Sequence, residues 1–194
     1  MTAWLVVGLG NPGSRYAGTR HNIGVQVVER LAERLGTRLR KVRFLPIDAG
    51  EATIDGKRLL LARPQTFVNV SGPPVASLAR RRRIDPPHIV ICHDEIDLAF
   101  GALKLKFGGS TAGHRGLESL AQALRTSEFH RVRLGVGRPP GRRDAADHVL
   151  GSFAPAEREE VGLLVEEAAD SVLTLLGSGL TAAQDRHNRS APRR

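Results

Sequence analysis

The sequence predicts a single α/β domain built on a mixed, twisted β-sheet with helices on both faces. Three observations lead to this fold class: short apolar runs alternate with amphipathic segments, one pair of runs is joined by a hairpin turn, and 194 residues suit one domain. Alternating strands and helices favour parallel pairing, and the hairpin adds an antiparallel pair. We place the domain at residues 1–188 and expect the basic segment 189–194 to be a disordered tail.

The N-terminal half contains strands and helices with clear periods. A strand is predicted at 5–7 from its apolar run, and a helix at 25–35 from apolar residues at helical spacing. Two strands at 44–54 and 57–62 are joined by an Asp-Gly dipeptide, which is typical of a two-residue hairpin. A helix at 75–83 follows two prolines, which its first turn tolerates.

The elements of the C-terminal half are predicted from the same two patterns, apolar runs for strands and helical spacing of apolar residues for helices. One of its strand-like runs, at 103–107, alternates apolar residues with lysine, so one face of that strand should be solvated. Short helical segments are expected near residue 150 and after residue 180. The main elements are strands at 88–92, 103–107 and 132–136 and helices at 117–124 and 157–176.

The chain carries a large excess of positive charge, with 29 Lys and Arg against 20 Asp and Glu and a net charge of +9. A balance this basic predicts a polyanionic partner, most often nucleic acid, although any single run could be a solvated face. Aromatic residues make up only 4%, which disfavours a stacking platform for single strands and favours phosphate contact. The basic runs are 38–43, 80–83, 104–106, 131–138 and 142–143.

The compartment is indicated by what the chain contains. Cys92 is the single cysteine, so an internal disulfide is impossible and a reducing compartment fits. The first residues lack the pattern of a secretory signal, and no apolar run approaches the roughly 18 residues that span a bilayer. We therefore expect a soluble, cytoplasmic protein with no membrane partner.

The segment 8–13 matches the dinucleotide-binding pattern G-x-G-x-x-G. That interpretation would predict a nucleotide-dependent oxidoreductase, but it needs a helix that opens within the turn. Here the loop 14–19 delays the helix, and the expected acidic strand end is missing. A tight turn that presents Asn11 is the better interpretation, and no nucleotide cofactor is expected.

His21 is the titratable residue of greatest interest. A histidine of near-neutral pKa can act as a general base towards water. A lone histidine at a helix start is more often a surface residue, but Asp94 also follows the end of a predicted strand. A carboxylate there can orient the imidazole and stabilise its protonated form. We expect His21 and Asp94 to meet at the carboxyl edge of the sheet.

Other reactive residues near Asp94 are weaker candidates. Cys92 lies inside an apolar strand, and buried cysteines are usually inert packing. A metal is only a weak option, because no zinc or calcium spacing is recognisable in this group. The residues concerned are His93, Asp94, Glu95, Asp97 and His114.

Three asparagines and one loop complete the candidate site. The amides of Asn11, Asn22 and Asn69 could orient a peptide-like substrate or bind an oxyanion, although asparagine also commonly caps helices and fills turns. The segment 108–116 is rich in glycine and could be an adaptable lid or a phosphate-binding loop.

Taken together, these motifs resemble the bacterial peptidyl-tRNA hydrolase family. The pieces occur in the family's order and spacing, and the match extends from Leu5 to about Asn188. As a set they are highly specific, although each piece alone is not. They read VGLGNPG, TRHNIG, QTFVNVSG, HDEIDL, KLKFGGSTAGHRGL and FHRVRLGVG.

The resemblance implies an α/β hydrolase that cleaves the ester between a peptide and the terminal ribose of tRNA. It assigns His21 as base and Asp94 as its orienter, and gives substrate and oxyanion contacts to Asn11 and Asn69. No metal or cofactor is implied, and a monomer is suggested. The other implied contacts are Tyr16, Asn22, Phe67, His114 and Arg115 for substrate and Lys104, Lys106, Arg133 and Arg143 for tRNA phosphates.

Three positions depart from the family pattern. Arg115 stands where the family usually has an asparagine that contacts substrate or water, and it could approach His21 or reach outward to phosphate. Val68 replaces a methionine, and Ala112 replaces a glycine. An alternative function is a non-catalytic RNA-binding protein on the same fold, which Arg115 favours and the retained His21 disfavours.

Overall fold

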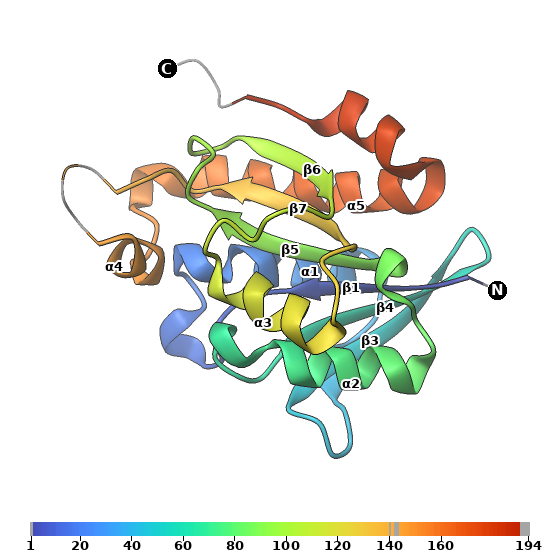
Figure 1. Cartoon of the computed structure of the whole chain (residues 1–194). Coiled ribbons are helices and arrows are strands. Elements are labelled where there is room, and N and C mark those ends of the chain that lie inside the picture. Colours follow the sequence, from blue (N-terminus) through green and yellow to red (C-terminus); the bar gives the residue numbers. More distant parts are fainter. Residues whose placement is uncertain (1, 140, 142–143, 191–194) are drawn as a thin grey trace.

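The computed structural model describes residues 2–139, 141 and 144–190 and contains a seven-stranded mixed sheet between layers of helices (Figure 1). The predicted fold class is confirmed. The strands are β1 (Ala3–Gly8), β2 (Arg40–Lys41), β3 (Ile47–Ile54), β4 (Lys57–Pro64), β5 (Ile89–Glu95), β6 (Leu103–Phe107) and β7 (His130–Gly135). The helices are α1 (Ile23–Arg34), α2 (Gly72–Arg82), α3 (Arg115–Leu124), α4 (Ala145–Leu150) and α5 (Arg158–His187).

The strand order is β2-β3-β4-β1-β5-β7-β6. The four central strands, β4, β1, β5 and β7, are parallel, whereas β2, β3 and β6 pair antiparallel with their neighbours. The hairpin between β3 and β4 turns at Asp55 and Gly56, both with positive φ, as a type I′ turn requires. The parallel strands therefore end together at one edge of the sheet.

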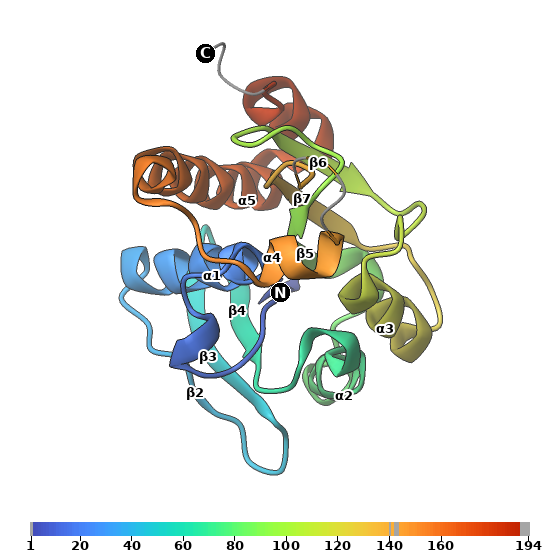
Figure 2. The same cartoon turned by 90° about the vertical axis from the view of Figure 1, so that its left-hand side faces the viewer.

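Helices α1 and α5 pack on one face of the sheet, and α2 and α3 pack on the other (Figure 2). Alternate residues of each central strand enter the two cores: Val6 and Val90 join one cluster, and Val7 and Ile91 join the other. None of the helices in the described ranges has both the length and the apolarity to cross a bilayer.

Close glycine contacts bring α1 onto the end of β1. A Cβ at Gly24 would lie 2.1 Å from the carbonyl oxygen of Cys92, and one at Gly8 would lie 2.3 Å from that of Gly24. A Cβ at Gly10 would collide with Asn22. The glycines of the G-x-G turn therefore admit a helix rather than a pyrophosphate, which agrees with the tight-turn interpretation.

The structure differs from the sequence prediction at several element ends. β5 continues through Asp94 and Glu95, because polar residues can end a strand whose backbone is still paired with β7. The short strand β2 was not predicted. A helix ending at residue 176 and a separate short helix after residue 180 were expected; helix is present in both places, and the two adjoin at Gly179, whose φ of 88° kinks the chain.

The C-terminal segment returns to the sheet after this kink. His187 contacts Glu167 and Thr174 on the earlier part of α5. Arg189, which the sequence assigned to a tail, exchanges two backbone hydrogen bonds with Leu103 at the outer edge of β6. Residues 191–194 of the expected tail lie outside the described residues.

Candidate active site

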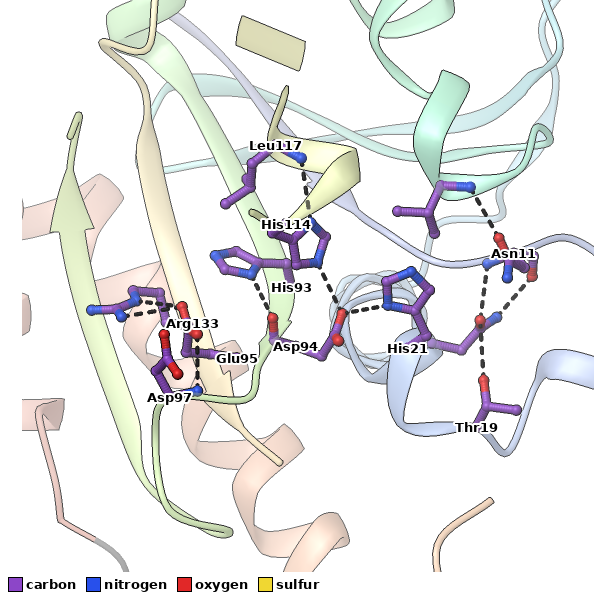
Figure 3. Close-up of polar contacts among 12 residues, drawn as sticks. Asn11, Thr19, His21, His93, Asp94, Glu95, Asp97, His114, Leu117 and Arg133 are labelled. Atoms are coloured by element: carbon purple, nitrogen blue, oxygen red, sulfur yellow. Dashed lines mark hydrogen bonds and ion pairs between the residues drawn. The ribbon is translucent and has the colours of Figure 1, made fainter. Parts of the chain in front are cut away.

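His21, Asp94 and His114 meet at the carboxyl edge of the sheet (Figure 3). His21 Nδ1 lies 2.8 Å from Asp94 Oδ1, and His114 Nε2 lies 3.1 Å from the same oxygen. His21 comes from a short turn before α1, Asp94 from the end of β5, and His114 from the residue that caps α3. The predicted meeting of His21 and Asp94 is therefore present, and His114 is a second partner.

The hydrogen-bond pattern assigns the proton of each ring. The Leu117 amide donates to His114 Nδ1 at 3.3 Å, so the His114 proton is on Nε2 and faces Asp94. The Asp94 carboxylate accepts from His21 Nδ1, which leaves His21 Nε2 as an unprotonated nitrogen. This tautomer is the one that a general base requires.

Electrostatics keep Asp94 ionised. Burial alone would raise the pKa of Asp94, but attraction and hydrogen bonds from His114 and His21 outweigh it and hold that pKa well below its usual range. Burial opposes protonation of His114, yet Asp94 more than offsets this and raises the pKa of His114. The carboxylate is thus available to stabilise a positive charge on either imidazole.

His93 supports the site from behind. Its Nδ1 donates to the backbone oxygen of Asp94 at 2.7 Å, and its ring meets the ring of His114 edge-on at 4.9 Å. Burial, together with repulsion from His114, lowers the pKa of His93 to about 3. This neutral ring fixes the backbone of Asp94.

Cys92 and the metal option are explained by the same geometry. Burial raises the pKa of the Cys92 thiol to about 12, so the thiol remains protonated, in agreement with a packing role.

The three residues at the sheet edge were also considered as metal ligands. One possible ligand atom each from His21, Asp94 and His114 lies within 4.8 Å of the others. Both facing nitrogens are, however, hydrogen-bond donors to one oxygen, which suits protons rather than a cation.

The three asparagines have different roles. Asn22 is buried, and its amide holds Asn11: Oδ1 accepts from Asn11 N–H, and Nδ2 donates to the Asn11 carbonyl, both at 2.9 Å. Asn11 Oδ1 accepts from the Val68 amide at 2.9 Å. This bond fixes the orientation of the side-chain amide and leaves Asn11 Nδ2 as the group that can donate to a substrate. Asn69 is exposed at the cavity wall. Asn22 was predicted to line the site but lies behind it as a support.

A cavity of ≈ 430 Å³ contains the candidate catalytic groups. His21, Asp94 and the two asparagines Asn11 and Asn69 line it, together with apolar residues of α4 that the sequence did not single out: Ala145, Ala146, Val149 and Leu150. Phe67, which is 55% exposed, forms another part of the wall and is met edge-on by Tyr16 at 6.3 Å. The cavity therefore has a polar base and an apolar wall.

Arg115 lines the same cavity at the first turn of α3. Its side chain is exposed, and within the described residues no carboxylate forms an ion pair with it. The side chain is therefore available to an anionic group entering the cavity.

The glycine-rich loop before His114 is held by Arg131. The buried guanidinium of Arg131 donates to the carbonyl oxygens of Gly109 and Ser110, each at 2.6 Å. The loop contains four positive φ angles, at Gly108, Gly109, Ala112 and Gly113. Arg131 was part of a basic run in the sequence, but only the fold reveals this contact.

The cations expected to contact tRNA lie on the outer strands of the sheet. Lys104 lies opposite Arg133, and Lys106 opposite Arg131, in the antiparallel register of β6 and β7. All four residues therefore share the face of the sheet opposite α5. Arg133 Nε and Nη2 both lie 3.1 Å from Glu95 Oε2, a contact that the sequence does not predict. Arg143, the fourth predicted contact, lies outside the described residues.

A larger hollow of ≈ 800 Å³ lies on the other side of α4. Arg20, Arg138 and His148 line it, together with Asp144, Asp147 and Glu157. Arg20 is paired with Glu157 at 2.7 Å, and Arg138 with Asp97. Both arginines of this hollow are thus matched by carboxylates, and His21 and Asp94 line the smaller cavity instead.

Fold and site define a class: an α/β protein with a carboxylate-oriented histidine at the end of its parallel strands, in a molecule whose edge strand β6 carries the exposed cations Lys104 and Lys106. This arrangement suits base-assisted hydrolysis next to a polyanion. A family model described as peptidyl-tRNA hydrolase matches residues 5–194, and the chain belongs to that family. The resemblance carried by the sequence motifs is confirmed.

Individual relatives agree with the family. A peptidyl-tRNA hydrolase from Frankia alni is 51% identical over 185 residues, covering 95% of this chain and 93% of the relative. One from Nocardia farcinica is 52% identical over 181 residues, covering 93% and 94%. The crystal structure of peptidyl-tRNA hydrolase from Acinetobacter baumannii superposes with a TM-score of 0.91 at 35% identity, covering 98% of this chain and 97% of that one.

Proposed function

We propose that this protein hydrolyses the ester bond between a peptide and tRNA, using water activated by His21. The observation that carries the proposal is the 2.8 Å hydrogen bond between His21 Nδ1 and Asp94, in a cavity that also contains Asn11 and Asn69. An ester is more reactive than an amide, so a positioned water and one base suffice without a covalent intermediate.

In the first step, a water molecule beside His21 Nε2 attacks the ester carbonyl carbon. Nε2 takes a proton from this water as the new carbon–oxygen bond forms, and the carbonyl oxygen becomes an oxyanion. Asp94 stabilises the imidazolium without itself being protonated. The free Nδ2 of Asn11 and the amide of Asn69 are the donors suited to the oxyanion.

In the second step, the tetrahedral intermediate collapses and the bond to the ribose oxygen breaks. The imidazolium of His21 returns its proton to this oxygen, which leaves as the terminal hydroxyl of tRNA. The peptide leaves with a free carboxyl group, and His21 is again neutral. No metal or cofactor is needed for this sequence, and we keep the expectation that none is used.

The cavity wall supports selectivity for blocked substrates. Val149, Leu150 and Phe67 offer an apolar surface to the group attached to the ester. A free aminoacyl group carries an ammonium ion, whose burial against such a wall is costly, and Arg115 adds repulsion. We therefore expect N-blocked aminoacyl-tRNA to be hydrolysed and free aminoacyl-tRNA to be spared.

Lys104, Lys106 and Arg133 are suited to phosphates near the 5′ end of the tRNA. They share one face of β6 and β7, on which Lys104 and Lys106 are exposed, and phosphate contacts bind RNA with little regard to sequence. Replacing any one of these cations by glutamine should lower the slope of log affinity against log salt by about 1.

Arg115 is suited to the terminal phosphodiester of the tRNA. This phosphate belongs to the nucleotide that carries the ester, so it enters the cavity region together with the scissile bond. Arg115→Asn should raise KM with a smaller change in kcat, and Arg115→Lys should retain part of the binding. An increase in kcat for Arg115→Asn would instead indicate that the arginine restrains the base.

The test is hydrolysis of N-acetyl-aminoacyl-tRNA by the wild type, His21→Ala and a matched control, His88→Ala. His88 precedes β5 at the opposite end of that strand. Release from the blocked substrate by the wild type and His88→Ala, but not by His21→Ala, would support the proposal. Binding of tRNA without release by the wild type would favour the alternative of a non-catalytic RNA-binding protein. A cytoplasmic location and a monomeric state stay predictions.

A further inference from the structure

A second basic surface lies on the strand pair β2–β3 and the end of α2. Its cavity of ≈ 410 Å³ is lined by Arg40, Lys41, Arg43, Arg81 and Arg82. The two basic runs are distant in sequence but meet here, because Arg81 Nη1 donates to the backbone oxygen of Arg43 at 2.9 Å. We call these five cations and the adjacent Phe44 the hairpin surface.

Phe44 is an unusual member of the hairpin surface. Its side chain is 78% exposed, and its φ of 61° lies in the left-handed region. A bulky residue in that conformation costs about 1–2 kcal/mol, and exposure of the ring gains nothing from burial. The Arg43 guanidinium lies over the ring at 4.5 Å, so one cation of the surface is in contact with the aromatic side chain. Strain and exposure at one residue point to binding.

The charges of the hairpin surface are mostly unmatched. Among the ion pairs of the described residues, Glu51 binds Arg82 at 2.6 Å, and no carboxylate pairs with the other four cations. A solvated surface run would scatter opposite charges among its cations. Several unpaired cations beside an exposed ring instead match RNA, whose phosphates bind arginine and whose unpaired bases stack on aromatic rings.

The position of the hairpin surface separates it from the tRNA contacts proposed above. β2 and β6 are the two edges of the sheet, and six strand spacings of about 4.8 Å put them about 29 Å apart. Figure 1 shows β6 at one side of the sheet and the β2–β3 turn projecting from the other. The hairpin surface therefore lies at the opposite edge of the sheet from the strands proposed to hold the 5′ end of the substrate.

We propose that the hairpin surface binds a second RNA, a strand with at least one unpaired base that belongs to a molecule other than the tRNA being hydrolysed. Phe44 stacks on the base, and Arg40, Lys41 and Arg43 contact its flanking phosphates. The separation from the substrate rests on the proposed tRNA contacts at β6–β7. The RNA contact itself depends only on the residues of the hairpin surface.

The test measures two independent quantities. The first is the affinity for a labelled, unstructured RNA of about 12 nucleotides. Phe44→Leu, which keeps an apolar side chain but removes the aromatic face, should weaken binding about fivefold or more, and Phe44→Trp should restore it. The double variant R40Q/K41Q should reduce the slope of log affinity against log salt by about 1.4. The control R158Q/R186Q removes the same charge from exposed positions on α5 and should change the affinity little.

The second quantity is kcat/KM for N-acetyl-aminoacyl-tRNA. Phe44→Leu and R40Q/K41Q should hydrolyse this substrate as the wild type does, and the short RNA should not compete with the substrate. Equal RNA affinity for the wild type, Phe44→Leu and R40Q/K41Q would overturn the proposal. A raised KM in these variants, or competition by the RNA, would also overturn it, because the surface would then hold the substrate tRNA. Absence of hydrolysis in the wild type would contradict the proposed function and leave the RNA affinities to decide this proposal.

Discussion

Asn22 holds Asn11 through both ends of its side-chain amide. The acceptor and donor bonds, each 2.9 Å, fix the Asn11 backbone, while Asn11 Oδ1 binds the Val68 amide. The turn after β1 and the loop after β4 are thereby joined through Asn11. The position of a candidate oxyanion donor therefore depends on a residue that does not line the cavity.

Replacing Asn22 by leucine should reduce both stability and kcat. The Asn11 backbone would lose two buried hydrogen bonds, at about 1–3 kcal/mol each, and displacement of its side chain should lower kcat at least about tenfold. Urea unfolding and single-turnover hydrolysis would measure the two effects. Asn69→Leu is the control, because Asn69 is exposed and its replacement should affect kcat without affecting stability. A destabilised Asn22→Leu with normal kcat would argue against a role for Asn11.

Variants of His114 can separate its two contacts. His114→Ala removes both the cap of α3 and the bond to Asp94, and should destabilise the protein by about 1 kcal/mol or more. His114→Asn keeps a good capping side chain, so it should recover most of the stability but not the Asp94 contact. Thermal unfolding and kcat would be compared. Equal losses of stability in the two variants would show that the cap contributes little.

The contribution of Asp94 to stability should depend on pH. Its pKa is depressed, so its stabilising contribution is present above the ordinary carboxyl pKa and is lost as pH falls through the folded value. The pKa of His114 is raised, so its contribution is present below the ordinary histidine value and is lost as pH rises through the folded value. The two windows overlap between about pH 4 and about pH 6.5.

The difference in unfolding free energy between the wild type and Asp94→Asn should therefore be largest near pH 5 and smaller near pH 8. Urea denaturation across this range would measure it. His93→Gln provides a comparison with the opposite trend, because burial lowers the pKa of His93 and its contribution to stability should fall, not rise, as pH falls below the ordinary histidine value. A difference that does not change with pH would contradict the coupling between Asp94 and His114.

Two glycines in helices should respond oppositely to alanine. Gly24→Ala places a Cβ 2.1 Å from the Cys92 carbonyl oxygen, so α1 must move and stability should fall by about 1–3 kcal/mol or more. At Gly162, exposed on α5, an added Cβ would meet no atom within 4 Å, so Gly162→Ala should stabilise by about 0.5–1 kcal/mol. Melting temperatures of the two variants would measure these changes. An unchanged melting temperature for Gly24→Ala would show that α1 can shift away from the Cys92 carbonyl without loss of stability.

Most of the fold could be predicted because its elements obey simple periods. β1, β6 and the hairpin at residues 55–56 follow directly from apolar runs and turn residues. β2 is two exposed residues long and has no hydrophobic pattern, so only its pairing with β3 reveals it. Gly179 lies between two helical stretches that look separate in sequence but adjoin in the chain.

The site could be predicted in part for a related reason. Asp94 lies at the end of β5, and His21 lies in the segment that connects β1 to α1. The carboxyl ends of these parallel strands meet at one edge of the sheet, which brings the two residues near each other. The support of Asn11 by Asn22, and of Arg133 by Glu95, depends on side-chain directions that no sequence period determines. Arg131 was only one member of a basic run in the sequence, since its burial under the loop 108–113 is a property of the folded chain.

The return of the C-terminal segment to β6 has a consequence for self-association. β6 is an edge strand, and exposed edge strands pair readily with other chains. Gln184, Asn188 and Arg189 occupy the outward N–H and C=O groups of Leu103 and Leu105. A chain ending at residue 183 would present these groups to solvent and should form dimers or larger aggregates as its concentration rises in sedimentation experiments, whereas one ending at residue 190 should not. The segment 184–189 thus prevents the edge strand β6 from pairing with a strand of another molecule.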